Sequence, residues 1–129
     1  MGLFISEGEF IEYMGTQKAK SDEVNGISLI SLNIRSLQPI TTVVFISHNF
    51  LFAAKYNEKL GFYSDGFFIE KKDIERYHLT EGILQNRLVI ETKIPINEQK
   101  NMQLKMSFSK ATAVAWHKYN LKRLKKYIS

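Results

Sequence analysis

Short segments of alternating apolar and polar residues, separated by turn residues, run through most of the chain and constrain its fold more than any other feature. The clearest is 103–108, in which Leu104, Met106 and Phe108 share one face of an extended chain. Residues 40–46 are dense in Val, Ile and Thr, which favour strands. A period of two is typical of strands that bury one face. Short strands with frequent turns predict a small β barrel or sandwich.

The pattern indicates about seven antiparallel strands with tight spacing. A loose alternation predicts a first strand at 9–14, and a clearer one predicts a strand at 27–34. Residues 40–46 and 50–54 are expected to form a hairpin around Ser47-His48-Asn49. Two aromatic runs, 61–63 and 67–69, are separated by an expected turn at Ser64-Asp65-Gly66. Further strands are expected at 77–80, 87–92 and 103–108.

The period of the apolar residues changes at Ser109, which can cap a helix by accepting a hydrogen bond from a free backbone N–H. Five apolar residues then recur at helical spacing and form one stripe: Ala111, Val114, Leu121, Leu124 and Ile128. We therefore expect an amphipathic helix over 109–128. A chain of 129 residues fits a single domain, 1–129, in which this helix closes the barrel.

The positive charge is concentrated at the C-terminal end. The chain has a net charge of +5, and residues 110–129 hold six basic residues and no acidic ones. The candidate residues for binding an anion or a partner are Lys118, Lys122, Arg123, Lys125 and Lys126. The candidate contact aromatics, which lie off the apolar stripe, are Trp116, Tyr119 and Tyr127. The alternative interpretation is a packing helix whose basic face is only solvated.

Composition indicates an ordinary globular protein, because 44% of the residues are hydrophobic and 24% are charged. Cysteine is absent, which excludes a disulfide framework and a thiolate metal site and fits a reducing compartment. The apolar run at the N-terminus is short and meets Glu7, Glu9 and Glu12, unlike a signal peptide. We expect a cytoplasmic protein that can lie peripherally at the inner membrane face.

No pattern in the chain predicts catalysis. His48, His78 and His117 lie far apart, and none has a second ligand at metal-binding spacing. The adjacent pair Ser47-His48 does not supply the side-chain geometry of a nucleophile and its base. Gly-x-Ser-x-Gly and Gly-rich phosphate loops do not occur in the sequence. We therefore expect no catalytic residues, no metal site and no cofactor.

The order of elements resembles a pleckstrin-homology-like (PH-like) domain of the bacterial PH and GRAM type. The resemblance extends from about Thr42 to Leu124 and rests on 44–52, 68–75, 88–92, 104–108 and the final helix with Trp116. It implies a barrel of antiparallel strands closed by one helix, and a binding or scaffold module rather than an enzyme. Phosphoinositide-binding members have a basic first hairpin loop. Here Lys18 and Lys20 are followed by Asp22 and Glu23, so the resemblance does not extend to that site.

The function expected from these observations is non-enzymatic protein binding, including self-assembly into a homo-oligomer. The alternative is peripheral binding to an anionic membrane or another polyanion through the basic C-terminal helix. The near-neutral charge of the rest of the chain argues against nucleic acid as the partner.

Overall fold

The computed structural model describes residues 5–17, 26–35, 38–57, 59–112 and 114–128. In chain order the elements are α1 (Glu7–Gln17), β1 (Gly26–Arg35), β2 (Gln38–Ser47), β3 (Phe50–Asn57), β4 (Phe62–Glu70), the short 3₁₀ helix η1 (Lys71–Asp73), β5 (Ile74–Glu81), β6 (Gln85–Pro95), β7 (Asn101–Ser109), α2 (Ala115–Leu121) and α3 (Lys125–Ile128). Lys18 and Lys20, and the acidic residues that follow them, lie outside the described residues.

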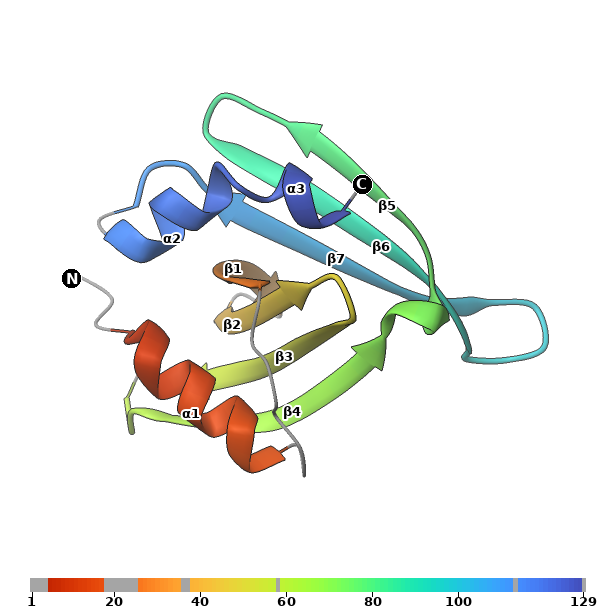
Figure 1. Ribbon diagram of the computed structural model, residues 1–129, viewed down its shortest axis with the longest axis horizontal. Helices are drawn as coiled ribbons and strands as arrows, with labels where there is room; N and C mark the ends of the chain where they lie inside the picture. The colour runs from red at the N-terminus through yellow and green to blue at the C-terminus, as the bar shows by residue number, and fades with distance from the viewer. Residues whose placement is uncertain (1–4, 18–25, 36–37, 58, 113, 129) are drawn as a thin grey trace.

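Seven antiparallel strands form two sheets, in the orders β1-β2-β3-β4 and β5-β6-β7. The expectation of a mainly β, α+β fold with about seven antiparallel strands is therefore confirmed, and within the described residues no closed barrel is formed. The edges of the two sheets meet where the Ser107 N–H donates to the Ser31 hydroxyl at 3.1 Å, which brings β7 beside β1. Figure 1 shows the second sheet lying across the first, with α2 and α3 beside β6 and β7.

The first sheet is apolar on both faces, and each face has its own core. One face, which includes Leu29, Val44 and Leu51, packs against the second sheet and the C-terminal helices. The other face includes Phe45 and Phe52 and packs against α1, as Figure 1 shows from the position of α1 over β3 and β4. The molecule thus has a helix, a sheet and a second sheet with its helices as successive layers.

The strand expected at 9–14 is wrong, because these residues belong to α1. Phe10 and Met14 are four positions apart, so a helix brings both to one side, where they are buried. The Phe10 and Phe52 rings are 5.8 Å apart, and Tyr13 stacks on Tyr63 at 5.4 Å. Packing on the second apolar face of the sheet therefore decides the conformation of this segment.

The turn expected at Ser64-Asp65-Gly66 is also wrong, because β4 continues through it with a bulge. Asp65 has a φ of 54°, in the left-handed region that Asp tolerates better than most residues. The strand passes close to Phe52 at Gly66, where a Cβ would lie 2.8 Å from the ring. A bulge of this kind bends a strand without ending it.

The helix expected over 109–128 is shorter than predicted and is divided in two. Ser109 is the last residue of β7, and its hydroxyl accepts a hydrogen bond from the Ala111 N–H in the turn that follows. Between α2 and α3 the Leu124 N–H bonds to the carbonyl oxygen of Leu121, three residues back, which tightens the chain. Of the five residues of the predicted stripe, Val114, Leu121 and Leu124 are buried and Ile128 is half-buried, whereas Ala111 is exposed and precedes α2.

Three polar side chains of α2, which the apolar stripe does not include, hold the helix in place. The Trp116 indole donates to the carbonyl oxygen of Ile5 at 3.0 Å. The Asn120 amide donates to Ser28 O at 2.9 Å and to the Glu7 carboxylate at 3.0 Å. These bonds connect α2 to β1 and to the start of α1.

His117 is the third of these side chains and is buried. Its Nδ1 accepts a hydrogen bond from the Ile30 N–H at 2.9 Å, so Nε2 carries the proton and donates to Ser109 O at 3.0 Å. Burial lowers the pKa of the imidazole, and the bond to Ser109 opposes that effect in part. His117 is therefore a neutral structural bridge between α2, β1 and the end of β7.

Candidate functional site

A groove of about 450 Å³ lies where the C-terminal helices meet the β5–β6 hairpin. We call it the Asn86 groove. It is lined by Leu79, Glu81, Asn86, Lys110, Lys118, Leu121, Lys122, Leu124 and Lys125. In Figure 1 this is the end of the molecule at which the β5–β6 turn lies closest to α2 and α3.

The floor of the Asn86 groove forms where the inward face of the second sheet changes from apolar to polar. Along β6, Leu88 is fully buried, and the next inward position toward the hairpin is Asn86. The register places Asn86 directly opposite Glu81 of β5. Two polar side chains thus lie side by side where a sheet of this kind normally continues its core.

Asn86 is only 5% exposed, yet its side-chain oxygen has no hydrogen-bond partner among the described residues. Leaving a buried acceptor unsatisfied costs about 1–3 kcal/mol, and native proteins rarely tolerate it without a reason. Asn86 therefore leaves one hydrogen-bond acceptor unused at the floor of the groove, among the described residues.

The rim of the groove is positively charged. Lys125 pairs with Glu81 at 3.0 Å, whereas Lys110, Lys118 and Lys122 form no salt bridge within the part of the chain that the structure describes. The hydrogen bond and charge of Lys125, followed by the charge of Lys110, lower the pKa of the Glu81 carboxyl. Glu81 is thus ionised and compensated, and the groove retains an excess of cationic groups.

The tip of the β5–β6 hairpin carries two apolar side chains that the described residues leave largely exposed. Ile83 is 92% exposed and Leu84 is 73% exposed. The Lys110 N–H donates to the carbonyl oxygen of Leu84 at 2.9 Å, which keeps this lysine beside the tip. A projecting apolar pair next to unpaired cations is an amphipathic surface, unlike a scattered exposed Leu.

The structure brings three of the five predicted basic residues to the Asn86 groove: Lys118, Lys122 and Lys125. Lys126 is exposed and does not line it. Arg123 is half-buried and bonded within the molecule, to the Asn120 side chain at 3.4 Å and to the Tyr127 hydroxyl at 3.3 Å. Its guanidinium also lies 5.3 Å from the centre of the Tyr119 ring, which leaves it less available to a ligand.

Of the three predicted contact aromatics, Tyr119 alone is largely exposed. Tyr127 is buried in the core beside the His48 ring, so its inclusion as a contact residue requires correction. Trp116 is half-buried and bonded to Ile5, where it supports the fold. A position off the apolar stripe did not mean that an aromatic residue is exposed. The C-terminal helices also bury a second side, which is aromatic and polar.

The sequence patterns missed the residues of the floor and the tip. Asn86 and Glu81 have no local signal, because only the hairpin register makes them neighbours. Ile83 and Leu84 had one, since they are an apolar pair directly after Gly82, between the strands expected at 77–80 and 87–92. Lys110 was counted in the charge of the C-terminal end and not as a site residue.

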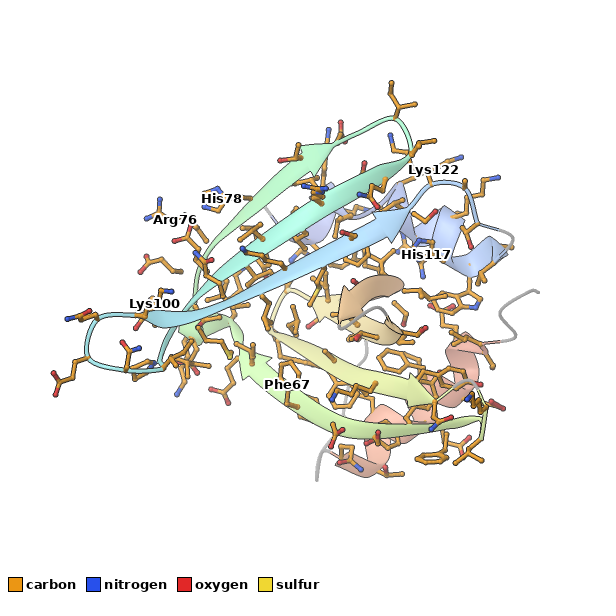
Figure 2. The ribbon with its side chains drawn as sticks, turned by 180° about the vertical axis from the view of Figure 1, so that it is seen from behind. Phe67, Arg76, His78, Lys100, His117 and Lys122 are labelled. Atoms are coloured by element: carbon orange, nitrogen blue, oxygen red, sulfur yellow. The ribbon has the colours of Figure 1, made fainter. Side chains whose placement is uncertain are left out.

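The histidines lie in three separate environments. His117 is bonded within the core, His48 contacts Tyr127, and His78 contacts the Glu91 carboxylate on the outer face of the second sheet. Figure 2 shows His78 and His117 on different elements, well apart. The described residues contain no group of three or more side chains suited to hold a metal ion. The Ser47 hydroxyl bonds to Phe50 O at 3.0 Å and serves the β2–β3 turn.

None of the described helices is long and apolar enough to cross a membrane. Comparison with protein-family models, with curated proteins and with solved structures finds no match for this chain.

Proposed function

We propose that the chain is a non-enzymatic, PH-like binding module that docks on an anionic membrane surface through the Asn86 groove and the hairpin tip. The observation that carries the proposal is the pair Ile83 and Leu84, largely exposed beside lysines that form no salt bridge with the described residues. The order of elements from β1 to α2 supports the PH-like assignment, in which the two sheets form an open barrel. In this proposal the protein acts at the cytoplasmic face of the membrane.

The two parts of the surface suit the two zones of a bilayer. Each lysine near an anionic membrane contributes about 1 kcal/mol of attraction, which salt screens. Full burial of a Leu or Ile side chain contributes about 1.5–3 kcal/mol. The lysines Lys110, Lys118 and Lys122 can contact headgroups while Ile83 and Leu84 enter the apolar boundary. A projecting tip needs no matching pocket in a lipid phase, as it would on a protein, and it gains nothing from nucleic acid.

Vesicle flotation with charge-reversal variants tests this function. Wild-type protein should float with anionic vesicles and not with neutral ones, and rising salt should weaken the association. The double variant Lys118→Glu, Lys122→Glu should lose binding. The matched control, Lys93→Glu with Lys100→Glu, carries the same charge change on exposed residues of another region. Figure 2 shows Lys100 at the opposite end of the second sheet from Lys122.

The tip is tested separately, because its contribution does not depend on charge. The double variant Ile83→Ser, Leu84→Ser should keep its salt dependence and bind anionic vesicles at least ten-fold more weakly, given about 1.4 kcal/mol per factor of ten. Equal flotation with neutral and anionic vesicles would contradict the proposal. So would equal loss of binding in the groove pair and the control pair of lysines.

A second candidate function is protein binding, including self-assembly, and the edge of the first sheet favours it. β4 is an edge strand, and three apolar residues at or near it are exposed: Leu60, Phe62 and Phe67. Exposed edges with apolar side chains are typical of strand-mediated association. Light scattering over a wide concentration range would show a dimer or larger species that Phe62→Ser reduces. A constant monomer mass would exclude self-assembly.

A further inference from the structure

The Asn86 groove combines groups that no simple anion satisfies together. Its lysines attract negative charge, whereas the Asn86 oxygen is an acceptor that lacks a donor. A phosphate or sulfate ion offers acceptor oxygens to the lysines and little to the amide oxygen. A ligand that completes the groove therefore carries both an anionic group and a separate hydrogen-bond donor.

The floor offers two acceptors in a fixed arrangement. Glu81 and Asn86 are direct partners across the hairpin, and such pairs have Cβ atoms about 4.5–5.5 Å apart. Glu81 pairs with Lys125, and a carboxylate can accept several more hydrogen bonds. Two hydroxyls on adjacent carbons can thus donate to the two side chains at once. Lys110, Lys118 and Lys122 are left to bind the anion.

The size and enclosure of the groove fit a small polar group. Its volume of about 450 Å³ lies within the roughly 300–1,000 Å³ typical of small-molecule sites. Leu79, Leu121 and Leu124 supply apolar walls for a carbon skeleton. The tip residues beside it would set such a group at the level of a membrane headgroup.

We propose that the Asn86 groove recognises a phosphodiester whose substituent carries neighbouring hydroxyls, the chemistry of a glycerol-phosphate headgroup. The lysines take the phosphate, and Asn86 and Glu81 accept from the two hydroxyls. This inference rests on the proposed function where the source is a lipid. A free glycerophosphodiester offers the same chemical groups without a membrane, and the experiment distinguishes it from the lipid.

The decisive comparison uses two lipids of equal charge. Phosphatidylglycerol carries the two hydroxyls, whereas phosphatidylethanol is a phosphodiester with none. Vesicles with equal fractions of either lipid should bind wild-type protein differently, with phosphatidylglycerol favoured about five-fold or more, the effect of one or two hydrogen bonds. Equal affinity for the two lipids overturns the headgroup inference and leaves the membrane proposal intact.

The variant Asn86→Leu should reduce the preference for phosphatidylglycerol, because Glu81 alone is left to accept from the hydroxyls, while its dependence on charge should be kept. Asn101→Leu, an exposed position on β7 at the far end of the second sheet, is the matched control and should keep the preference. Should Asn86→Leu fail to fold, the comparison of the two lipids on wild-type protein remains decisive.

Soluble glycerophosphoglycerol, the deacylated headgroup, separates the two sources. Titration of wild-type protein followed by NMR should give saturable shifts of the amide signals around Asn86 and Glu81. Shifts without any vesicle binding would refute membrane docking and assign the groove to a free phosphodiester. Failure to discriminate the two lipids, together with no shifts, would overturn the inference entirely. Stronger shifts with an acidic peptide than with glycerophosphoglycerol would also overturn it.

Discussion

His117 holds α2 against the first sheet through both ring nitrogens, and replacing it tests how this helix is anchored. The ring accepts from the Ile30 N–H at 2.9 Å and donates to Ser109 O at 3.0 Å. The substitution His117→Leu replaces the imidazole with an apolar side chain of comparable size and so removes both hydrogen bonds. The fold should survive, and its free energy of unfolding should fall.

The size of the loss follows from which partner becomes unsatisfied. Ile30 is buried, so its N–H would lose its acceptor without gaining water, at a cost of about 1–3 kcal/mol. Ser109 is exposed, and water can replace the bond to its carbonyl oxygen. We therefore expect a decrease of about 1–3 kcal/mol in urea unfolding near neutral pH. The control His78→Leu, on an exposed position of β5, should change stability by less than about 0.5 kcal/mol.

The same residue makes stability depend on pH. Burial lowers the pKa of folded His117 below 6.5, the value expected in the unfolded chain. As the pH falls through about 6.5, the unfolded state binds the proton first, so stability is full above that pH and is lost below it. The loss continues toward the folded pKa, at no more than about 1.4 kcal/mol per pH unit. In His117→Leu this part of the slope should disappear.

Unfolding of both proteins between about pH 7.5 and pH 5.5 would check the reasoning. A wild-type curve that is flat over this range would show that the bridge does not depend on the neutral ring. An unfolding free energy for His117→Leu within about 0.5 kcal/mol of wild type would show that the Ile30 amide is satisfied in another way.

Other substitutions test the two cores and the close approaches between strands. Phe52→Ala should lower the unfolding free energy by about 3–5 kcal/mol, because the ring is fully buried under α1. A loss below about 1 kcal/mol in urea unfolding would mean that α1 does not pack there. Asn120→Leu should cost about 1–3 kcal/mol by leaving Ser28 O without its donor. Hydrogen exchange of the β1 amides should become faster in this variant. Unchanged protection would contradict the hydrogen bond between Asn120 and Ser28. Gly26→Ala would place a Cβ 2.4 Å from Ile46 O and should lower the thermal midpoint, whereas an unchanged midpoint would refute that approach.

The strands were largely predictable, because their side chains alternate between core and solvent. In β7, for example, Met106 and Phe108 are buried while Gln103 and Lys105 are exposed, as the alternation requires. The hairpin at Ser47 was also predictable, since its hydroxyl accepts from the N–H groups of Asn49 and Phe50 within the turn. These features depend on residues close together in the sequence.

The errors arose where distant packing decides local structure. The segment 9–14 is helical because the first sheet has a second apolar face, which includes Phe45 and Phe52. The sequence does contain a signal for this second face, because one strand is apolar at nearly every position. Such a strand indicates that both of its faces are covered by other elements. The C-terminal helix was predicted too long because β7 extends through Ser109.

For the candidate site, the sequence predicted the cationic side chains and not the groove that they surround. Lys118, Lys122 and Lys125 were found from charge alone, and charge gives attraction without selectivity. The acceptors Glu81 and Asn86 become neighbours through the register of β5 and β6, which local sequence specifies poorly. The selectivity that we propose therefore rests on the part of the site that only tertiary structure creates.

The bonds from α2 to the beginning of the chain have a consequence for how the protein folds. Trp116 reaches Ile5 and Asn120 reaches Glu7, across separations of 111 and 113 residues. Contacts between such distant positions require most of the chain to be ordered first, and they slow folding. During synthesis, the hairpins of the first sheet can pair while α1 has no partner from α2. The core between α1 and the first sheet then gains its last anchors only after residues 115–121 have emerged from the ribosome.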